Sequence, residues 1–95
     1  PFELVVGGRL IRGRIDAIYA RDGGGFDVID FKTGQVPRDF AAASLQLSVY
    51  RLAWADLAAV DPDVVDAGFL YVRTGTVKRP DTLLSRDELA ALLTG

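Results

Sequence analysis

Polar and apolar residues alternate in three stretches of the first third of the chain. Alternation predicts β-strands, because successive side chains of a strand point to opposite faces. The three stretches run from Phe2 to Val6, from Leu10 to Tyr19 and from Phe26 to Lys32. Gly7-Gly8 and a glycine-rich connection around Gly23 separate them, and both suit hairpin turns. The pattern therefore predicts a three-stranded antiparallel meander.

A different pattern, rich in Ala and Leu, extends from Phe40 to about Val60 and predicts a long helix. Asp39 precedes this segment as its expected N-cap, and Pro62 follows it, where proline cannot continue a helix. Four apolar residues of the segment are expected to pack against the sheet: Leu45, Val49, Leu52 and Trp54.

The last third of the chain predicts more strands and a second helix. Asp66 to Arg73 predicts a fourth strand, and Val77 marks a short fifth one. Ser85 and Glu88 have the spacing of a capping box at the start of a last helix. The long helix makes a crossover, so the third and fourth strands should lie parallel in one mixed sheet. The expected fold class is α/β in the order β-β-β-α-β-α, with flanking helices and a single domain over residues 1–95.

Two charged residues, Asp30 and Lys32, share one face of the third predicted strand, while Ile29 and Phe31 point to the other. Such a pair usually belongs to a solvated surface with weak ion pairs. A cleft that binds a metal ion and a phosphate is the alternative, and it would account for both charges.

A hairpin folded about Gly23 adds a second carboxylate to this face. The pairs that follow are Ile15 with Phe31, Ala17 with Ile29, Asp16 with Asp30, and Arg14 with Lys32. Directly opposed carboxylates repel each other, and a divalent cation would turn that repulsion into attraction. A register shift of two residues would keep the same faces, so the shared surface is expected in either case.

Composition limits the chemistry that this chain can perform. Its 95 residues include no Cys and no His, which excludes thiolate metal sites and Ser-His-Asp or Cys-His catalysis within the chain. A bound metal would have to be a hard cation held by oxygen atoms. The net charge of −2 is unlike that of a free-standing nucleic-acid binder, which is normally basic. Five basic residues nevertheless lie in or beside the second and third strands: Arg9, Arg12, Arg14, Lys32 and Arg38.

Three motifs together resemble the RecB-like nucleases of the PD-(D/E)XK superfamily. They are Gly13-Arg14-Ile15-Asp16, the run Val28-Ile29-Asp30-Phe31-Lys32-Thr33-Gly34, and Gln46-Leu47-Ser48-Val49-Tyr50. The resemblance implies a restriction-endonuclease-like fold and metal-dependent hydrolysis of DNA. It further implies a nuclease module of a bacterial repair or recombination helicase-nuclease, located in the cytoplasm at the nucleoid. The implied partners are DNA and the helicase domains of the same parent chain or complex, with no membrane.

The resemblance also implies roles for individual residues. Asp16 and Asp30 would bind Mg2+ or Mn2+ together with the backbone carbonyl of Phe31. Asp16, Asp30 and Lys32 would be the catalytic residues, with Lys32 at the attacking water and the phosphate. Nucleic-acid binding would involve three further residues: Gln46, Tyr50 and Arg14. Gln46 and Tyr50 lie four apart on one helix face, where they would contact the nucleic acid or order the lysine. Tyr50 as a core aromatic is the alternative.

The chain departs from the family in lacking a His or Glu on a helix before the first strand, so we expect a fragment without that upstream helix. Glu3 could pair with Arg12 and share the face of Asp16. A catalytically inactive scaffold or DNA-guiding domain within a repair complex is therefore a second hypothesis. A plain α/β interaction domain without metal binding is a third.

Overall fold

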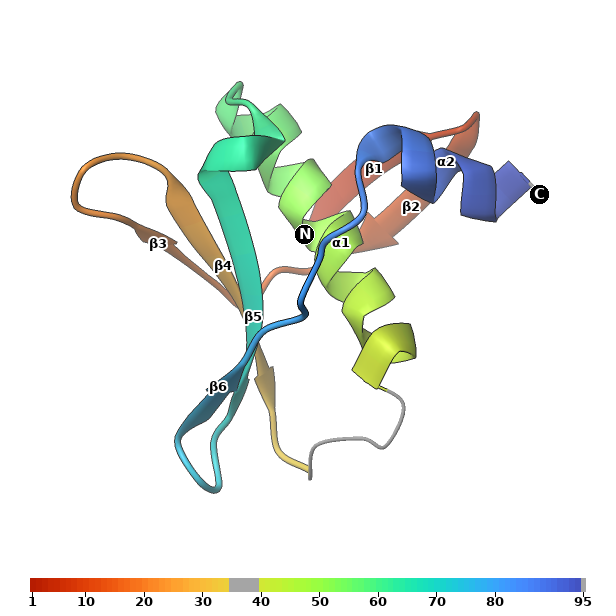
Figure 1. Ribbon diagram of the computed structural model, residues 1–95. Coiled ribbons are helices and arrows are strands. Elements are labelled where there is room, and N and C mark those ends of the chain that lie inside the picture. The colour runs from red at the N-terminus through yellow and green to blue at the C-terminus, as the bar shows by residue number, and fades with distance from the viewer. Residues whose placement is uncertain (35–39, 95) are drawn as a thin grey trace.

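The structure is a computed structural model that describes residues 1–34 and 40–94. These residues form two separate sheets and two α-helices (Figure 1). The small sheet pairs β1 (Phe2–Val6) with β2 (Arg9–Gly13). The large sheet has the order β3-β4-β5-β6. Its strands are β3 (Ala17–Ala20), β4 (Phe26–Lys32), β5 (Val65–Tyr71) and β6 (Thr76–Lys78).

The crossover connection is confirmed, because β4 and β5 are parallel and α1 (Phe40–Ala58) lies between them in sequence. A short 3-10 helix (Pro62–Val64) follows α1, with Asp61 as its N-cap, and leads into β5. Both α-helices lie on the same side of the large sheet, and α1 runs between that sheet and the β1–β2 hairpin (Figure 1). The predicted α/β fold class, with a mixed sheet and flanking helices, is therefore confirmed.

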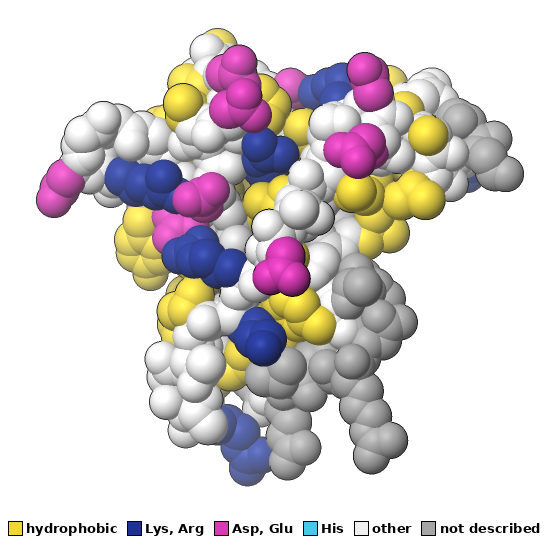
Figure 2. All heavy atoms as spheres, viewed as in Figure 1, with side chains coloured by type: hydrophobic (Ala, Val, Ile, Leu, Met, Phe, Trp, Pro, Cys, Tyr) yellow, Lys and Arg dark blue, Asp and Glu magenta, His cyan; other side chains and the backbone are white. Residues whose placement is uncertain are grey.

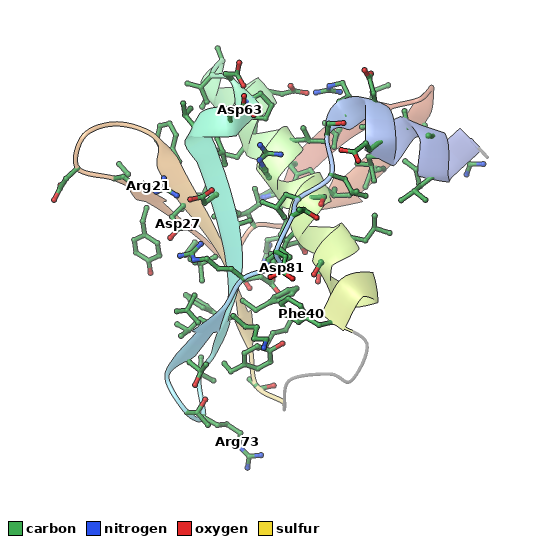
Figure 3. The ribbon with its side chains drawn as sticks, in the orientation of Figure 1. Arg21, Asp27, Phe40, Asp63, Arg73 and Asp81 are labelled. Atoms are coloured by element: carbon green, nitrogen blue, oxygen red, sulfur yellow. The ribbon has the colours of Figure 1, made fainter. Side chains whose placement is uncertain are left out.

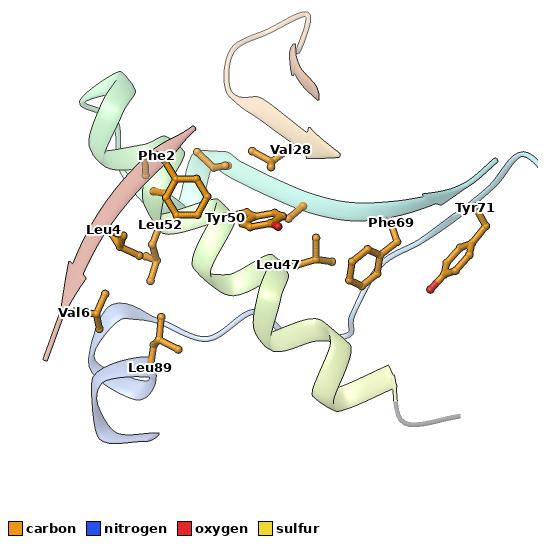
Figure 4. Close-up of a cluster of buried hydrophobic side chains, with 14 residues drawn as sticks. Phe2, Leu4, Val6, Val28, Leu47, Tyr50, Leu52, Phe69, Tyr71 and Leu89 are labelled. Atoms are coloured by element: carbon orange, nitrogen blue, oxygen red, sulfur yellow. The ribbon is translucent and has the colours of Figure 1, made fainter. Parts of the chain in front are cut away.

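The hydrophobic core lies between the large sheet, α1 and β1 (Figure 4). In β1 the alternation of buried and exposed residues places Phe2, Leu4 and Val6 inside. Phe69 and Tyr71 project from β5 toward the side of α1. Burial of apolar surface of this kind is the main driving force for folding. The cluster thereby fixes the distance of α1 from β4 and β5, on which the candidate site depends.

The predicted second strand, from Leu10 to Tyr19, is wrong as a single element. It divides into β2 and β3, and the chain bends at residues 14–16. The two halves have different partners, since β2 pairs with β1 and β3 pairs with β4. The expected three-stranded meander is consequently split over two sheets, because one straight strand cannot follow both partners.

The second helix, α2 (Arg86–Thr94), begins as predicted. Ser85 N donates to Glu88 Oε1 at 3.0 Å, and Glu88 N donates to Ser85 Oγ at 3.2 Å, which completes the capping box. Of the four apolar residues expected to pack from α1, Leu52 is fully buried, whereas Leu45 is 38% exposed. The prediction that Leu45 packs against the sheet is therefore wrong, because Leu45 lies on an exposed part of the helix surface. The expected N-cap Asp39 and the basic residue Arg38 lie outside the described residues.

The β5–β6 turn at Thr74-Gly75 and the short strand at Val77 are also confirmed. No helix in residues 1–34 and 40–94 is both long and apolar enough to cross a membrane.

Candidate active site

Strand β4 presents Asp30 and Lys32 to the side of the sheet that α1 covers. This placement follows from strand alternation, since Phe26 and Val28 of the same face pack in the core. Asp30 is only 5% exposed, although Asp is among the residue types that are rarely buried without a partner. The solvated-surface interpretation of the pair is therefore wrong for Asp30.

Asp16 lies just outside the β3–β4 ladder. That ladder begins with Ala17 opposite Ile29, as predicted, but the bend before Ala17 ends the pairing there. Asp16 Oδ2 accepts a hydrogen bond from the backbone N–H of Phe31 at 2.9 Å. The predicted opposition of Asp16 to Asp30 within the ladder is therefore wrong, yet both carboxylates meet beside Phe31. The other two predicted pairs, Ile15 with Phe31 and Arg14 with Lys32, do not form either.

The electrostatics of Asp30 are those of a buried acid with competing neighbours. Burial raises the pKa of Asp30, the Lys32 ammonium lowers it, and Asp16 raises it again. Lys32 Nζ is 2.8 Å from Asp30 Oδ2. That oxygen is buried, and the ion pair with Lys32 compensates part of the cost of burying its charge. The Lys32 ammonium is thus the cation next to this oxygen, and a metal ion bound by Asp30 would share the carboxylate with it.

Lys32 is held from three directions. Besides the Asp30 carboxylate, Nζ donates to Gln46 Oε1 at 3.3 Å and lies 5.2 Å from the centre of the Phe69 ring. The neighbouring carboxylate is the main reason why the pKa of Lys32 is raised. The side chain is thus a positioned, protonated ammonium at neutral pH.

Gln46 connects Lys32 to Tyr50 through one turn of α1. Gln46 Nε2 donates to the Tyr50 hydroxyl at 2.6 Å, so the two residues do share a helix face. The Tyr50 ring is buried, packs edge-on against Phe2 with centroids 5.5 Å apart, and burial raises its pKa. The interpretation of Tyr50 as a core aromatic therefore also holds, and only its hydroxyl reaches the site.

Phe69 and Tyr71 are site residues that the sequence analysis did not identify. In the parallel register Asp30 pairs with Phe69, and Lys32 pairs with Tyr71. The signal was available, because the crossover was predicted and two aromatic residues alternate with Leu70 in the fourth strand. What was missing was the register between two parallel strands that are far apart in sequence.

Arg14 and Glu3 are not drawn into this cluster. Arg14 is exposed in the bend between β2 and β3. Glu3 pairs with Arg12 across the small sheet at 3.3 Å, as predicted for that pair. Both side chains of that ion pair are exposed, so it adds no buried charge to the site.

Two carboxylates and one main-chain carbonyl are the donors available for a metal ion. Within residues 1–34 and 40–94, no group of three or more acidic, His or Cys side chains comes together. Mg2+ suits such a sparse set of oxygen donors, because it keeps several water ligands. Asp16, Asp30 and the carbonyl of Phe31 are thus oxygen donors of the kind that a hard divalent cation prefers, with Asp16 exposed and Asp30 buried.

Comparison with known proteins agrees with this geometry. The family described as the PD-(D/E)XK nuclease superfamily matches residues 1–93. The Gene 69 protein of Mycobacterium phage D29 is 37% identical to this chain over 79 residues. The match covers 83% of this chain but 28% of the phage protein, so the chain spans less than a third of that relative.

Proposed function

This chain belongs to the PD-(D/E)XK nuclease superfamily, whose members are usually nucleases that use divalent metal ions, and we propose that it hydrolyses phosphodiester bonds in DNA with Mg2+ or Mn2+. The observation that carries the proposal is the ion pair of buried Asp30 with half-buried Lys32, with Asp16 beside it. A structural ion pair alone would not need the second carboxylate.

In this proposal Asp16, Asp30 and the carbonyl of Phe31 bind the cation. When bound, the metal lowers the pKa of a water molecule and stabilises negative charge on the phosphate. Lys32 contributes a fixed positive charge, because its ammonium is protonated at neutral pH. It orients the attacking water and offsets charge on the phosphate oxygens.

Gln46 and Tyr50 are positioning residues in this scheme. The carboxamide of Gln46 accepts from Lys32 and donates to Tyr50, so its orientation is fixed by the buried hydroxyl. This restricts the Lys32 ammonium to the side of the sheet on which Asp30 lies. Arg14, which is exposed and has no acid partner among the described residues, would contact a phosphate of the DNA backbone.

The biological setting belongs to the same proposal. We infer a RecB-like nuclease module that works with helicase domains in DNA repair or recombination. The match to less than a third of the phage protein is consistent with a module of a larger protein. A catalytically inactive, DNA-guiding domain is the second candidate, and it is favoured by the small number of acidic ligands among the described residues.

A cleavage assay separates these two candidates. A labelled DNA duplex and a single strand are incubated with the chain in Mg2+ or Mn2+ and, in parallel, in chelator. We expect metal-dependent hydrolysis that Asp30→Asn or Lys32→Gln lowers by about 100-fold or more, the loss typical for a group that stabilises a transition state. Asp22→Asn is the charge-matched control, since Asp22 is exposed in the turn between β3 and β4.

Equal hydrolysis by the chain and its Asp30→Asn variant would show that this site does not perform the reaction. DNA binding without hydrolysis in either metal would favour the DNA-guiding domain.

A further inference from the structure

The hairpin that joins β5 and β6 carries basic residues that the proposed chemistry does not use. Residues 67–80 contain Arg73, Lys78 and Arg79 but no Asp or Glu, in a chain with 13 acidic residues. Arg79 is neutralised by a bidentate ion pair with Asp27, at 2.7 and 2.6 Å. Arg73 and Lys78 are both exposed. Neither ion pairs within the described residues nor the proposed chemistry accounts for these two exposed positive charges.

The hairpin extends directly from the end of the candidate site. Tyr71, the last residue of β5, pairs with Lys32, the last residue of β4. The next residue, Val72, donates its backbone N–H to the carbonyl of Lys32 at 3.0 Å. The turn that carries Arg73 therefore starts directly after Tyr71, the residue that pairs with Lys32.

Lys78 lies on the same face of the sheet as Lys32. In the antiparallel register Lys78 is opposite Phe69, the residue whose ring lies under Lys32. Lys78 Nζ is 5.5 Å from the centre of the Phe40 ring, and the rings of Phe40 and Phe69 pack edge-on at 5.9 Å. One aromatic pair thus separates the two ammonium groups, and each cation–π contact limits the freedom of its side chain.

Arg73 and Lys78 have no acid partner among the described residues, whereas most of the other arginines do. The ion pairs are Arg12–Glu3, Arg21–Asp66, Arg51–Asp63, Arg79–Asp27 and Arg86–Asp56. Charges that are already paired add little to the attraction of a polyanion. The hairpin therefore carries two free positive charges in a net acidic chain.

The distribution of charge over the surface shows the same asymmetry. On the face drawn in Figure 2, acidic side chains gather on the upper part of the molecule, away from the hairpin that Figure 1 places at the lower end. Figure 3 shows Arg73 at the tip of that hairpin, pointing away from the body of the protein. An extended cation beyond the end of β5 can reach a ligand that lies across the site.

We propose that the β5–β6 hairpin binds the sugar–phosphate backbone of the DNA next to the bond that is cut, with Arg73 and Lys78 each holding a phosphate. This inference rests on the proposed nuclease function and extends it, because it assigns the path of the nucleic acid from Lys32 along Lys78 to Arg73. The hydroxyls of Thr74 in the turn and of Thr76 at the start of β6, which are exposed, would add neutral contacts to the same backbone.

Binding measured without hydrolysis tests the hairpin. Fluorescence anisotropy of a labelled duplex and of a labelled single strand is recorded in chelator, over about 50 to 200 mM salt. We expect Arg73→Gln and Lys78→Gln each to weaken binding about three- to ten-fold at the lowest salt. Each should also make the slope of log K against log salt shallower by about 0.9 for duplex DNA or about 0.7 for a single strand.

Arg9→Gln is the matched control, because it removes the same charge from an exposed residue of the small sheet that has no acid partner among the described residues. Lys78→Arg keeps the charge and should retain most of the affinity. A smaller salt slope in the hairpin variants, but not in Arg9→Gln, supports the proposal. Equal losses in all three Gln variants would mean that only net charge matters, which overturns it.

The failure of this inference can be told apart from the failure of the proposed function. Metal-dependent hydrolysis with unchanged binding by Arg73→Gln and Lys78→Gln would overturn the hairpin and leave the active site intact. A chain that neither binds nor cuts DNA would overturn both. In the cleavage assay the hairpin variants should raise KM and leave kcat nearly unchanged, since they act on binding of the ground state and the transition state alike.

Discussion

Asp30 places a carboxylate in a nearly dry position, and a single residue of this kind has a measurable cost. Because burial raises its pKa, ionised Asp30 destabilises the folded chain at neutral pH. We expect Asp30→Asn to raise the free energy of unfolding and with it Tm, because the amide removes the buried charge and keeps an oxygen acceptor for the Lys32 ammonium. Thermal unfolding in chelator measures it. Asp16→Asn is the control, since Asp16 is exposed and should change Tm little.

The pH dependence of this effect has a definite sign. The folded chain holds the Asp30 proton more tightly than the unfolded chain, so wild-type stability rises as the pH falls through the raised pKa toward the ordinary value of 3.8. The variant lacks this titration. Its advantage over wild type should therefore shrink as the pH falls from 7 to about 4. An advantage that is constant with pH would show that burial of the charge is not the cause.

At the residue level, the sequence was enough to predict that the charged residues of the candidate site lie together, but it did not show the aromatic residues that pack beneath them. Asp16, Asp30 and Lys32 could be selected from strand alternation and motif spacing, and the helical spacing of Gln46 and Tyr50 placed both on one face. Alternation assigns a face to a residue, but it does not give the register between distant parallel strands. The aromatic support beneath Lys32 depends on that register and became visible only in the structure.

Among the elements, the β3–β4 hairpin contains consecutive glycines that differ in how much space a side chain would have. Gly23 and Gly25 both have positive φ, at 82° and 87°. A Cβ on Gly23 would meet nothing within 4 Å, whereas a Cβ on Gly25 would lie 2.5 Å from the carbonyl oxygen of Val64. Of these two glycines, therefore, Gly25 packs against the 3-10 helix before β5 and Gly23 does not.

This contrast gives a matched pair of variants. Gly23→Ala should cost about 1 kcal/mol of stability, from the strain of positive φ. Gly25→Ala should cost that amount and about 1–3 kcal/mol more, because a backbone carbonyl must move. Urea unfolding of both variants gives the difference directly. Equal costs would mean that the contact with Val64 adds nothing to the stability of the hairpin.

The elements also show where local patterns mislead. The residues from Leu10 to Tyr19 alternate as one strand should, yet two sheets share them. Ile11 of β2, Ile15 of the bend and Ile18 of β3 all pack against the core, so apolar residues continue through residues 14–16 although the strand does not. Tertiary contacts determine which strands pair, and the pattern of ten consecutive residues does not predict that pairing.

At the scale of the whole molecule, the carboxylates that would bind a metal ion lower the stability of the metal-free fold, and a bound metal ion would restore it. The buried charge of Asp30, with Asp16 beside it, destabilises the metal-free site, and a bound cation would offset that cost and add its own binding energy to folding. Ligand that binds only the folded chain stabilises it by about 2.7 kcal/mol at a concentration of about 100 times Kd. We therefore expect Mn2+ or Mg2+ to raise the Tm of the wild-type chain in a saturable manner.

The Asp16→Ala, Asp30→Ala double variant makes this prediction specific. The variant loses the buried charge, but it also loses the acceptor of the Phe31 N–H and the carboxylate beside Lys32. Circular dichroism must therefore show that the variant is folded before a loss of metal binding is ascribed to the missing ligands. Calorimetric titration of both proteins with Mn2+ should show binding in the wild-type chain and none in the variant. Equal Tm shifts in both would place the cation elsewhere on this acidic molecule. No binding in either would mean that these two carboxylates and one carbonyl do not suffice to hold the ion, and hydrolysis by this chain would then require a ligand that the described residues do not supply.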